Sequence, residues 1–456
     1  MPARLCIHDA LLVGPDAVRP GGVVVGDDGR IEALLADGER AAARTTVDAR
    51  GKPLFAGFVD GHVHMRDPGF PQKEDFASGT AAAAVGGVTT VLCMPNTMPS
   101  VHDLDGLAAA ERAAAGHARV DYGFEAAAGR DNSAALEALW AAGVVSFETQ
   151  FSEADPADLL DDDEVLAAVL AEVARLGAVL GVYTGDQRGT AQRSGALRAA
   201  GRGDPMAYVE ARPAEFEVAG LERLVRLAQG TAARLLARQV STADGLELLA
   251  GAKSVLDLAI EVTPHHLHLD TGAIARHGRF ALMAPPLRTE RDVAAVRAAL
   301  ADGLVDVVGS DHAPHAVAEK EIADLWQMPG GTPGLDTIVP AVLDLAARGV
   351  IPLERVAQVL GARPAALFGL ADRKGALRLG ADGDLVLVDL DATRTIGPGD
   401  IRSRAGHGPF AGSTLRGWPV LTALRGEVIA ADGELCPGEP GGRLQRRQGA
   451  AAETQR

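Results

Sequence analysis

The chain has 456 residues, of which 47% are hydrophobic and 23% charged, a composition typical of globular proteins with room for a large barrel and a satellite domain. Its net charge of -17 argues against nucleic acid or an anionic membrane as a partner, but not against a small anionic substrate. The three cysteines are far apart, no apolar run reaches the roughly 18 residues of a membrane span, and no signal-peptide pattern opens the chain. These features predict a cytoplasmic protein without disulfides.

The N-terminal and C-terminal parts of the chain share one sequence pattern. Residues 1–54 consist of short apolar runs separated by Gly, Asp and Pro, which predicts short strands, and the same pattern returns in residues 372–437. Because both segments flank the middle of the chain, we expect them to form one small β-sandwich domain. Residues 438–456 are polar, rich in Gly, Arg and Gln, and without periodicity, which predicts a disordered tail.

Residues 55–371 alternate between apolar runs of strand length and Ala/Leu-rich stretches with the i, i+3, i+4 spacing of helices. Eight such repeats, with strands apolar enough to be buried on both faces, predict a parallel (β/α)8 TIM barrel. A doubly wound open sheet is the alternative, but it would usually have a Gly-rich phosphate turn after its first strand, which residues 61–69 are not. The eight predicted strands are residues 55–62, 89–95, 120–127, 144–148, 178–184, 235–241, 258–265 and 305–312.

Two histidines end the first predicted strand. His62 and His64 are two residues apart, so both imidazoles leave the strand on one side. In a barrel, catalytic residues stand at the C-terminal ends of the strands, and Asp311 ends the eighth. Two imidazoles and one carboxylate are typical of a catalytic metal site that leaves room for water. A buried Asp there can move the proton of that water, so the pattern predicts metal-assisted hydrolysis.

Other polar residues fall at neighbouring strand ends. Arg66 and Asn96 follow the first and second strands, and His315 lies four residues beyond Asp311. An Arg side chain can hold a carboxylate bidentately, so these three residues predict an anion-binding substrate site. His265, in a Pro-His-His run after the seventh strand, is a further ligand candidate, although such a run is more often a packed loop.

Several segments together resemble one known family. They are residues 57–97, E-V-T-P-H-H-L at 261–267, V-G-S-D-H-A-P-H at 308–315 and residues 409–429. They resemble the dihydroorotases and their cyclic-amide hydrolase relatives, the allantoinases and hydantoinases, in the amidohydrolase superfamily. The H-x-R and M-P-N-T motifs are more similar to dihydroorotase. The resemblance implies reversible ring opening of dihydroorotate to N-carbamoyl-aspartate in the pathway of pyrimidine biosynthesis.

The resemblance also implies residue roles. It makes His62 and His64 zinc ligands, Asp311 the metal-bound acid and base, and Arg66, Asn96 and His315 contacts to the substrate.

The chain departs from the family pattern at four positions. Where the family has a carboxylated lysine this chain has Glu148, and Tyr183 and Gln239 stand where the family has two further histidines. Ala284 replaces a substrate-binding Asn. Because Tyr and Gln are poor zinc ligands, we expect a degenerate centre with one zinc ion per chain, to which Glu148 is a further candidate ligand.

Two functional classes follow. The first is a one-metal cyclic-amide hydrolase acting on dihydroorotate, or else on allantoin or a hydantoin. The second is an inactive dihydroorotase-like chain that assembles with aspartate transcarbamoylase. A homo-oligomer is expected from the resemblance in either case.

Overall fold

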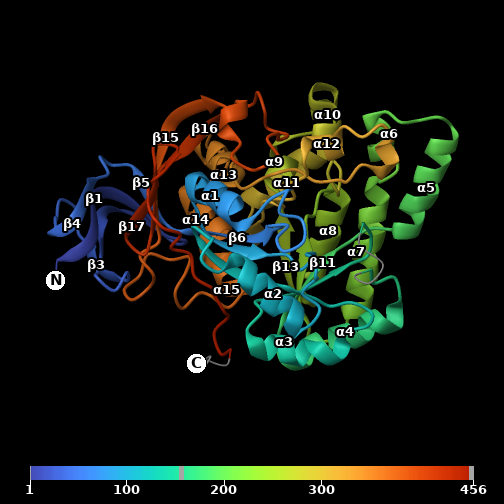
Figure 1. The fold of residues 1–456 in the computed structure, drawn as a ribbon, viewed down its shortest axis with the longest axis horizontal. Helices are drawn as coiled ribbons and strands as arrows, with labels where there is room; N and C mark the ends of the chain where they lie inside the picture. Colours follow the sequence, from blue (N-terminus) through green and yellow to red (C-terminus); the bar gives the residue numbers. More distant parts are fainter. Residues whose placement is uncertain (1, 154–158, 451–456) are drawn as a thin grey trace.

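The computed structural model describes residues 2–153 and 159–450, and it consists of a barrel and a small β domain side by side (Figure 1). Parallel pairing runs through β6–β7–β8 and through β9 to β14 in chain order. One residue separates β8 from β9, and a parallel bridge between Val63 and His312 joins the two ends of the sheet. The predicted (β/α)8 barrel is therefore confirmed, and the open-sheet alternative is wrong.

The barrel strands are short and buried on both faces, as the continuous Val/Leu/Ala-rich runs require. Their bounds are β6 (Phe58–Val63), β7 (Val88–Cys93), β8 (Asp121–Phe124), β9 (Ala126–Ala127), β10 (Phe147–Gln150), β11 (Val179–Tyr183), β12 (Arg234–Arg238), β13 (Asp257–Val262) and β14 (Val307–Val308).

The helices surround this barrel and follow from local sequence signals. In α4 (Asp163–Leu176), the Asp162 side chain accepts from the amides of Glu164 and Val165, and Gly177 ends the helix at φ 64 just before β11 begins. The other helices are α1 (Phe76–Gly86), α2 (Leu104–Ala114), α3 (Leu136–Ala142), α5 (Gln187–Ala199), α6 (Pro205–Glu210), α7 (Ala214–Ala228), α8 (Ala243–Ala252), α9 (Pro264–His268), α10 (Gly272–His277), α11 (Glu290–Ala301), α12 (Val317–Lys320), α13 (Ile338–Ala347), α14 (Leu353–Ala357) and α15 (Arg363–Leu367). No helix among the described residues is both long and apolar enough to cross a membrane.

The small domain joins both ends of the chain in one nine-stranded sheet, as expected, with β5 between β15 and β1. The single strand predicted over residues 55–62 is in fact two, because the chain passes from one domain to the other at Gly57. The pairing of β5 with β15 runs to Ala56, the amide of Gly57 still donates to the carbonyl of Asp384 at 2.7 Å, and β6 starts at the next residue. The strands are β1 (Ala3–Val13), β2 (Val18–Val25), β3 (Ile31–Leu35), β4 (Ala43–Asp48), β5 (Pro53–Ala56), β15 (Leu385–Thr395), β16 (Thr414–Leu424), β17 (Glu427–Ala431) and β18 (Glu434–Leu435).

A buried ammonium group links the two domains. The Nζ of Lys374 donates to Asp121 of β8 at 2.5 Å and to Asp384, beside β15, at 2.7 Å, and it lies 2.9 Å from Asp382. The three carboxylates lie close enough together to resemble a metal site, but the lysine already occupies the space between them.

The prediction of a disordered tail is wrong for residues 438–450. The amide of Gln445 donates to the carbonyl of Tyr122 at 2.7 Å, and the Arg447 guanidinium lies 3.5 Å from the centre of the Trp140 ring. Contacts with backbone carbonyls and aromatic faces hold this segment against the barrel, and a polar composition does not reveal such contacts. Residues 451–456 of the predicted tail lie outside the described residues.

Candidate active site

Three of the four predicted metal ligands meet at the C-terminal mouth of the barrel. His62 is the penultimate residue of β6, His64 lies just beyond the strand, and Asp311 follows β14; they are 3%, 8% and 5% exposed. The Oδ1 atom of Asp311 lies 3.5 Å from Nε2 of His62 and 3.4 Å from Nε2 of His64. Two ligands about 2.1 Å from a tetrahedral zinc ion are about 3.4 Å apart, so this donor set fits a divalent ion.

A hydrogen bond at Nδ1 orients each of the two histidines. The Nδ1 of His62 lies 2.7 Å from Oε1 of Glu261, and the Nδ1 of His64 lies 2.7 Å from Oδ1 of Asn96. Because both partner oxygens accept, each Nδ1 carries the proton and each Nε2 is the atom that faces the ion site. Asn96, predicted as a substrate contact, thus also holds a ligand in place.

The protonation of these residues sets how an ion would bind. Burial opposes a charge on His62, but Glu261 outweighs burial and raises the pKa of His62 to about 9. Burial lowers the pKa of His64 to about 4. Burial also opposes ionisation of Asp311, yet the neighbouring imidazoles of His64 and His62 hold its pKa below the ordinary value. The free site is therefore an ionised Asp311, a neutral His64 and a protonated His62.

The affinity for Zn²⁺ is expected to rise about tenfold per pH unit up to about pH 9 and then to level off, because an ion must displace the proton of His62. Glu261→Gln removes the charge that holds this proton, so the rise should end at a lower pH. Competition with a chelator across this pH range measures the effect, with Glu247→Gln on the exposed face of α8 as the control. Identical pH profiles for Glu261→Gln and the unmodified chain would contradict the assigned role of Glu261.

Glu148, the fourth predicted ligand, ends up beside the trio. It lines the same cavity, but it does not belong to the group of His62, His64 and Asp311 whose ligand atoms lie within 4.8 Å of one another. Its Oε2 accepts from Nε of Arg238 at 3.0 Å, while its buried Oε1 has no hydrogen-bond partner. Burial raises the pKa of Glu148 to about 7.

The predicted anion site forms the wall next to the ion site. The Nη2 of Arg66 lies 3.2 Å from Nε2 of His315, and the Nε of Arg66 donates to the carbonyl of Pro314 at 3.3 Å. Burial, together with the nearby cations Arg66, Lys73 and Lys320, keeps the pKa of His315 far below its usual range. His315 is therefore neutral, and Arg66 carries the positive charge next to it.

The positions that depart from the family pattern also face this cavity. Tyr183, Gln239 and Ala284 all line it, and Nε2 of Gln239 lies 3.5 Å from the carbonyl of Ala284. His265 is buried against His266, with ring centroids 4.5 Å apart, and it is not part of the ligand trio. Its Nε2 has no hydrogen-bond partner.

Tyr208 and Arg212 are among the cavity residues that the sequence analysis did not identify. Tyr208 on α6 is buried, lines the cavity and has a hydroxyl without a hydrogen-bond partner. The Arg212 guanidinium stacks 3.6 Å from the centre of the Tyr208 ring and donates to both carboxylate oxygens of Glu153, at 2.9 and 3.2 Å. A lone Tyr in a short helix and a lone Arg in the loop after it carry no spacing signal that could have revealed them.

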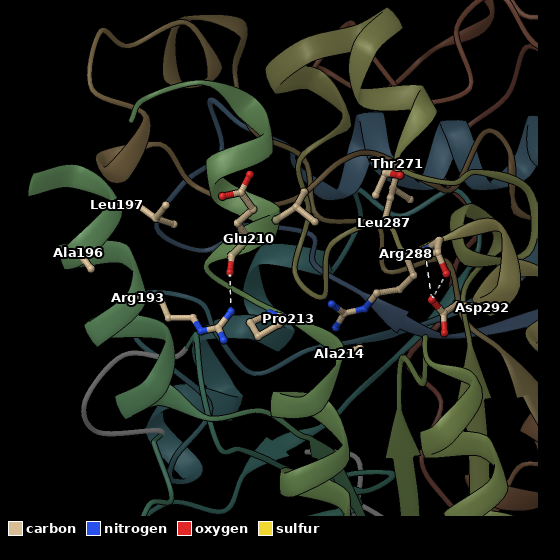
Figure 2. Close-up of a pocket in the computed structure, with 12 residues that line it drawn as sticks. Arg193, Ala196, Leu197, Glu210, Pro213, Ala214, Thr271, Leu287, Arg288 and Asp292 are labelled. Atoms are coloured by element: carbon tan, nitrogen blue, oxygen red, sulfur yellow. Dashed lines mark hydrogen bonds between the residues drawn. The ribbon is translucent and has the colours of Figure 1, made fainter. Parts of the chain in front are cut away.

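The cavity has a volume of about 450 Å³, which suits a single small ring. A second, more apolar hollow of about 620 Å³ lies between α5, α6 and the start of α11 and shares no lining residue with the first (Figure 2). Its polar side chains are already engaged: Arg193 donates to the carbonyl of Glu210 at 3.3 Å, and Asp292 accepts from Thr289. The ion site and the anion site both belong to the first cavity.

Comparison with known proteins agrees with this geometry. Residues 54–429 match the amidohydrolase family. The chain is 32% identical to an L-hydantoinase of Paenarthrobacter aurescens, covering 94% of this chain and 95% of the relative. It is 37% identical to a dihydroorotase of Halobacterium salinarum, with 88% and 94% covered, and 35% identical to an allantoinase of Streptomyces avermitilis, with 98% and 99% covered.

The solved structure of an L-hydantoinase from Arthrobacter aurescens superposes with a TM-score of 0.94 at 31% identity, covering 98% of this chain and all of that one. None of these comparisons supports the alternative of an inactive assembly partner. The family match, the barrel and the ligand trio agree: the chain belongs to the amidohydrolase family, among the cyclic amidohydrolases.

Proposed function

We propose that this chain uses one zinc ion to open the ring of an anionic cyclic amide, dihydroorotate or a close relative, to the N-carbamoyl amino acid. One observation carries the proposal. The carboxylate of Asp311 lies between two imidazole nitrogens in the same 450 Å³ cavity whose next wall carries Arg66 and His315. The hydrolytic groups and the anion site thus line one cavity.

The residues divide the chemistry between them. A divalent ion held by His62, His64 and Asp311 would polarise the ring carbonyl and make a water molecule more acidic. The ionised Asp311 takes a proton from the attacking water as the new C–O bond forms. It then returns the proton to the ring nitrogen as the C–N bond breaks, so the net reaction adds one water.

Substrate orientation follows from the second wall. Arg66 supplies the charge that binds a ring carboxylate, and neutral His315 lies 3.2 Å from its Nη2. The amide nitrogen of Asn96 remains for a ring carbonyl, since its oxygen is engaged with His64. The unpartnered hydroxyl of Tyr208 offers a further donor to the ring. Relatives named for hydantoinase and allantoinase activity make a hydantoin and allantoin the competing substrates.

Arg66→Ala is expected to lower kcat/KM for dihydroorotate about 10- to 100-fold, because a charge-assisted hydrogen bond contributes about 1.5–3 kcal/mol. The same variant should barely affect dihydrouracil, which has the ring but no carboxylate. The measurement is ring opening of both compounds by the zinc-loaded chain, with Arg193→Ala in the second hollow as the control.

Faster opening of a 5-substituted hydantoin or of allantoin than of dihydroorotate would favour the competing substrates. Equal losses on dihydroorotate and dihydrouracil would contradict the carboxylate-binding role of Arg66.

A further inference from the structure

A fully buried guanidinium lies beside the ion site. The side chain of Arg238, the last residue of β12, is 0% exposed. It donates to Glu148 at 3.0 Å through Nε, to Glu261 at 2.7 Å through Nη1, and to Glu125 through Nη2. Nη1 also donates to the carbonyl of Gly61 at 2.8 Å. Three carboxylates from three separate parts of the barrel wall thus converge on one cation.

This network is continuous with the ion site. Glu261 binds Arg238 with one oxygen and the Nδ1 of His62 with the other, at 2.7 Å. The second oxygens of Glu148 and Glu125 are buried and unpartnered, and Glu148 lines the catalytic cavity. Gly181 leaves room for the ion pair of Glu148 and Arg238. A side-chain carbon added at Gly181 would lie 2.1 Å from Oε2 of Glu148 and 2.7 Å from Nε of Arg238.

Three buried carboxylates at one point need a positive charge, because an unpaired buried charge costs several kcal/mol. Proteins meet this need with a bound metal ion or with a basic side chain. In this chain the planar guanidinium of Arg238 supplies the positive charge, and it binds one oxygen of each of the three carboxylates. Those oxygens are then no longer available to a metal ion.

We propose that the Arg238 guanidinium takes the place of a second divalent cation, and that it thereby limits the centre to the single ion held by His62, His64 and Asp311. Arg238 is a positioning residue in this scheme: it fixes Glu148 directly and His62 through Glu261. The inference rests on the proposed single-ion hydrolase.

The test is the Mn²⁺ content of the full chain, measured by elemental analysis after loading and gel filtration. The unmodified chain should hold one ion and Arg238→Ala should hold two. In the variant, the space left by the guanidinium is surrounded by three carboxylates whose negative charge no cation balances. Arg238→Lys keeps the charge and should hold one. Arg234→Ala, at the exposed start of β12, is the matched control and should also hold one.

Each outcome is decisive. One ion in both the unmodified chain and a folded Arg238→Ala would overturn this inference and leave the proposed function intact. Two ions in the unmodified chain would overturn the single-ion centre itself. If Arg238→Ala unfolds without metal but folds with two ions at saturating Mn²⁺, the inference is supported. If it stays unfolded there, the inference is wrong, since an ion would supply the missing charge.

Discussion

His64→Ala is expected to abolish both ion binding and hydrolysis. The variant leaves His62 and Asp311 as the only members of the trio, and it removes the imidazole whose Nε2 lies 3.4 Å from Oδ1 of Asp311. A catalytic ion contributes several kcal/mol to the transition state, so the rate should fall about a thousandfold or more. Elemental analysis of dialysed protein should show less than one-tenth of an ion per chain, and ring opening should be lost with it.

His117→Ala provides the control for this experiment. His117 is an exposed histidine just after α2 and is not among the residues that line the catalytic cavity. Its replacement should leave both the ion content and the rate unchanged. A His64→Ala chain that keeps one ion and most of its rate would contradict the assignment of the ion site.

The barrel and its metal trio could be predicted because both depend on local sequence patterns. The alternation of apolar runs and helical stretches defines the barrel. The two-residue spacing of His62 and His64 places both imidazoles on one side of a strand end. Asp311 could be added because parallel strands bring all their C-terminal ends to one face. The structure brings these three residues together as expected.

The network behind the trio could not be predicted in the same way. Glu125, Arg238 and Glu261 each lie at or beside the C-terminal end of a largely apolar strand, which signals a buried partner without naming it. The partners become evident only when barrel closure brings separate strands together. Glu148 illustrates the difficulty, because its position suggested a metal ligand, whereas one of its oxygens is taken up by Arg238.

Roles can also be shared in ways that a motif does not reveal. Asn96 was predicted as a substrate contact, yet its oxygen holds His64 at 2.7 Å. Loss of its side chain would therefore affect the ion and the substrate together. Substrate preference is equally hidden, because it depends on wall residues such as Tyr208 and Arg212 that come from outside the barrel strands.

Asp311→Asn should separate ion binding from proton transfer. Asn has nearly the same shape, and its oxygen can still face the ion, but it cannot accept the proton of the attacking water. The expected result is a fall in kcat of about 10²- to 10⁴-fold, the usual contribution of a positioned acid or base, with an ion content near one. Asp257→Asn, at the exposed opposite end of β13, should leave kcat unchanged.

Glu148→Gln is the informative comparison, because Glu148 is the other buried carboxylate in this cavity with a free oxygen. If Oε1 of Glu148 were the proton acceptor, Glu148→Gln would lose the rate and Asp311→Asn would keep it. We expect Asp311→Asn to lose the rate and Glu148→Gln to keep it. Asp311 lies between the two imidazole nitrogens, whereas Glu148 is hydrogen-bonded to Arg238. The ratio of the two kcat values therefore identifies which carboxylate moves the proton.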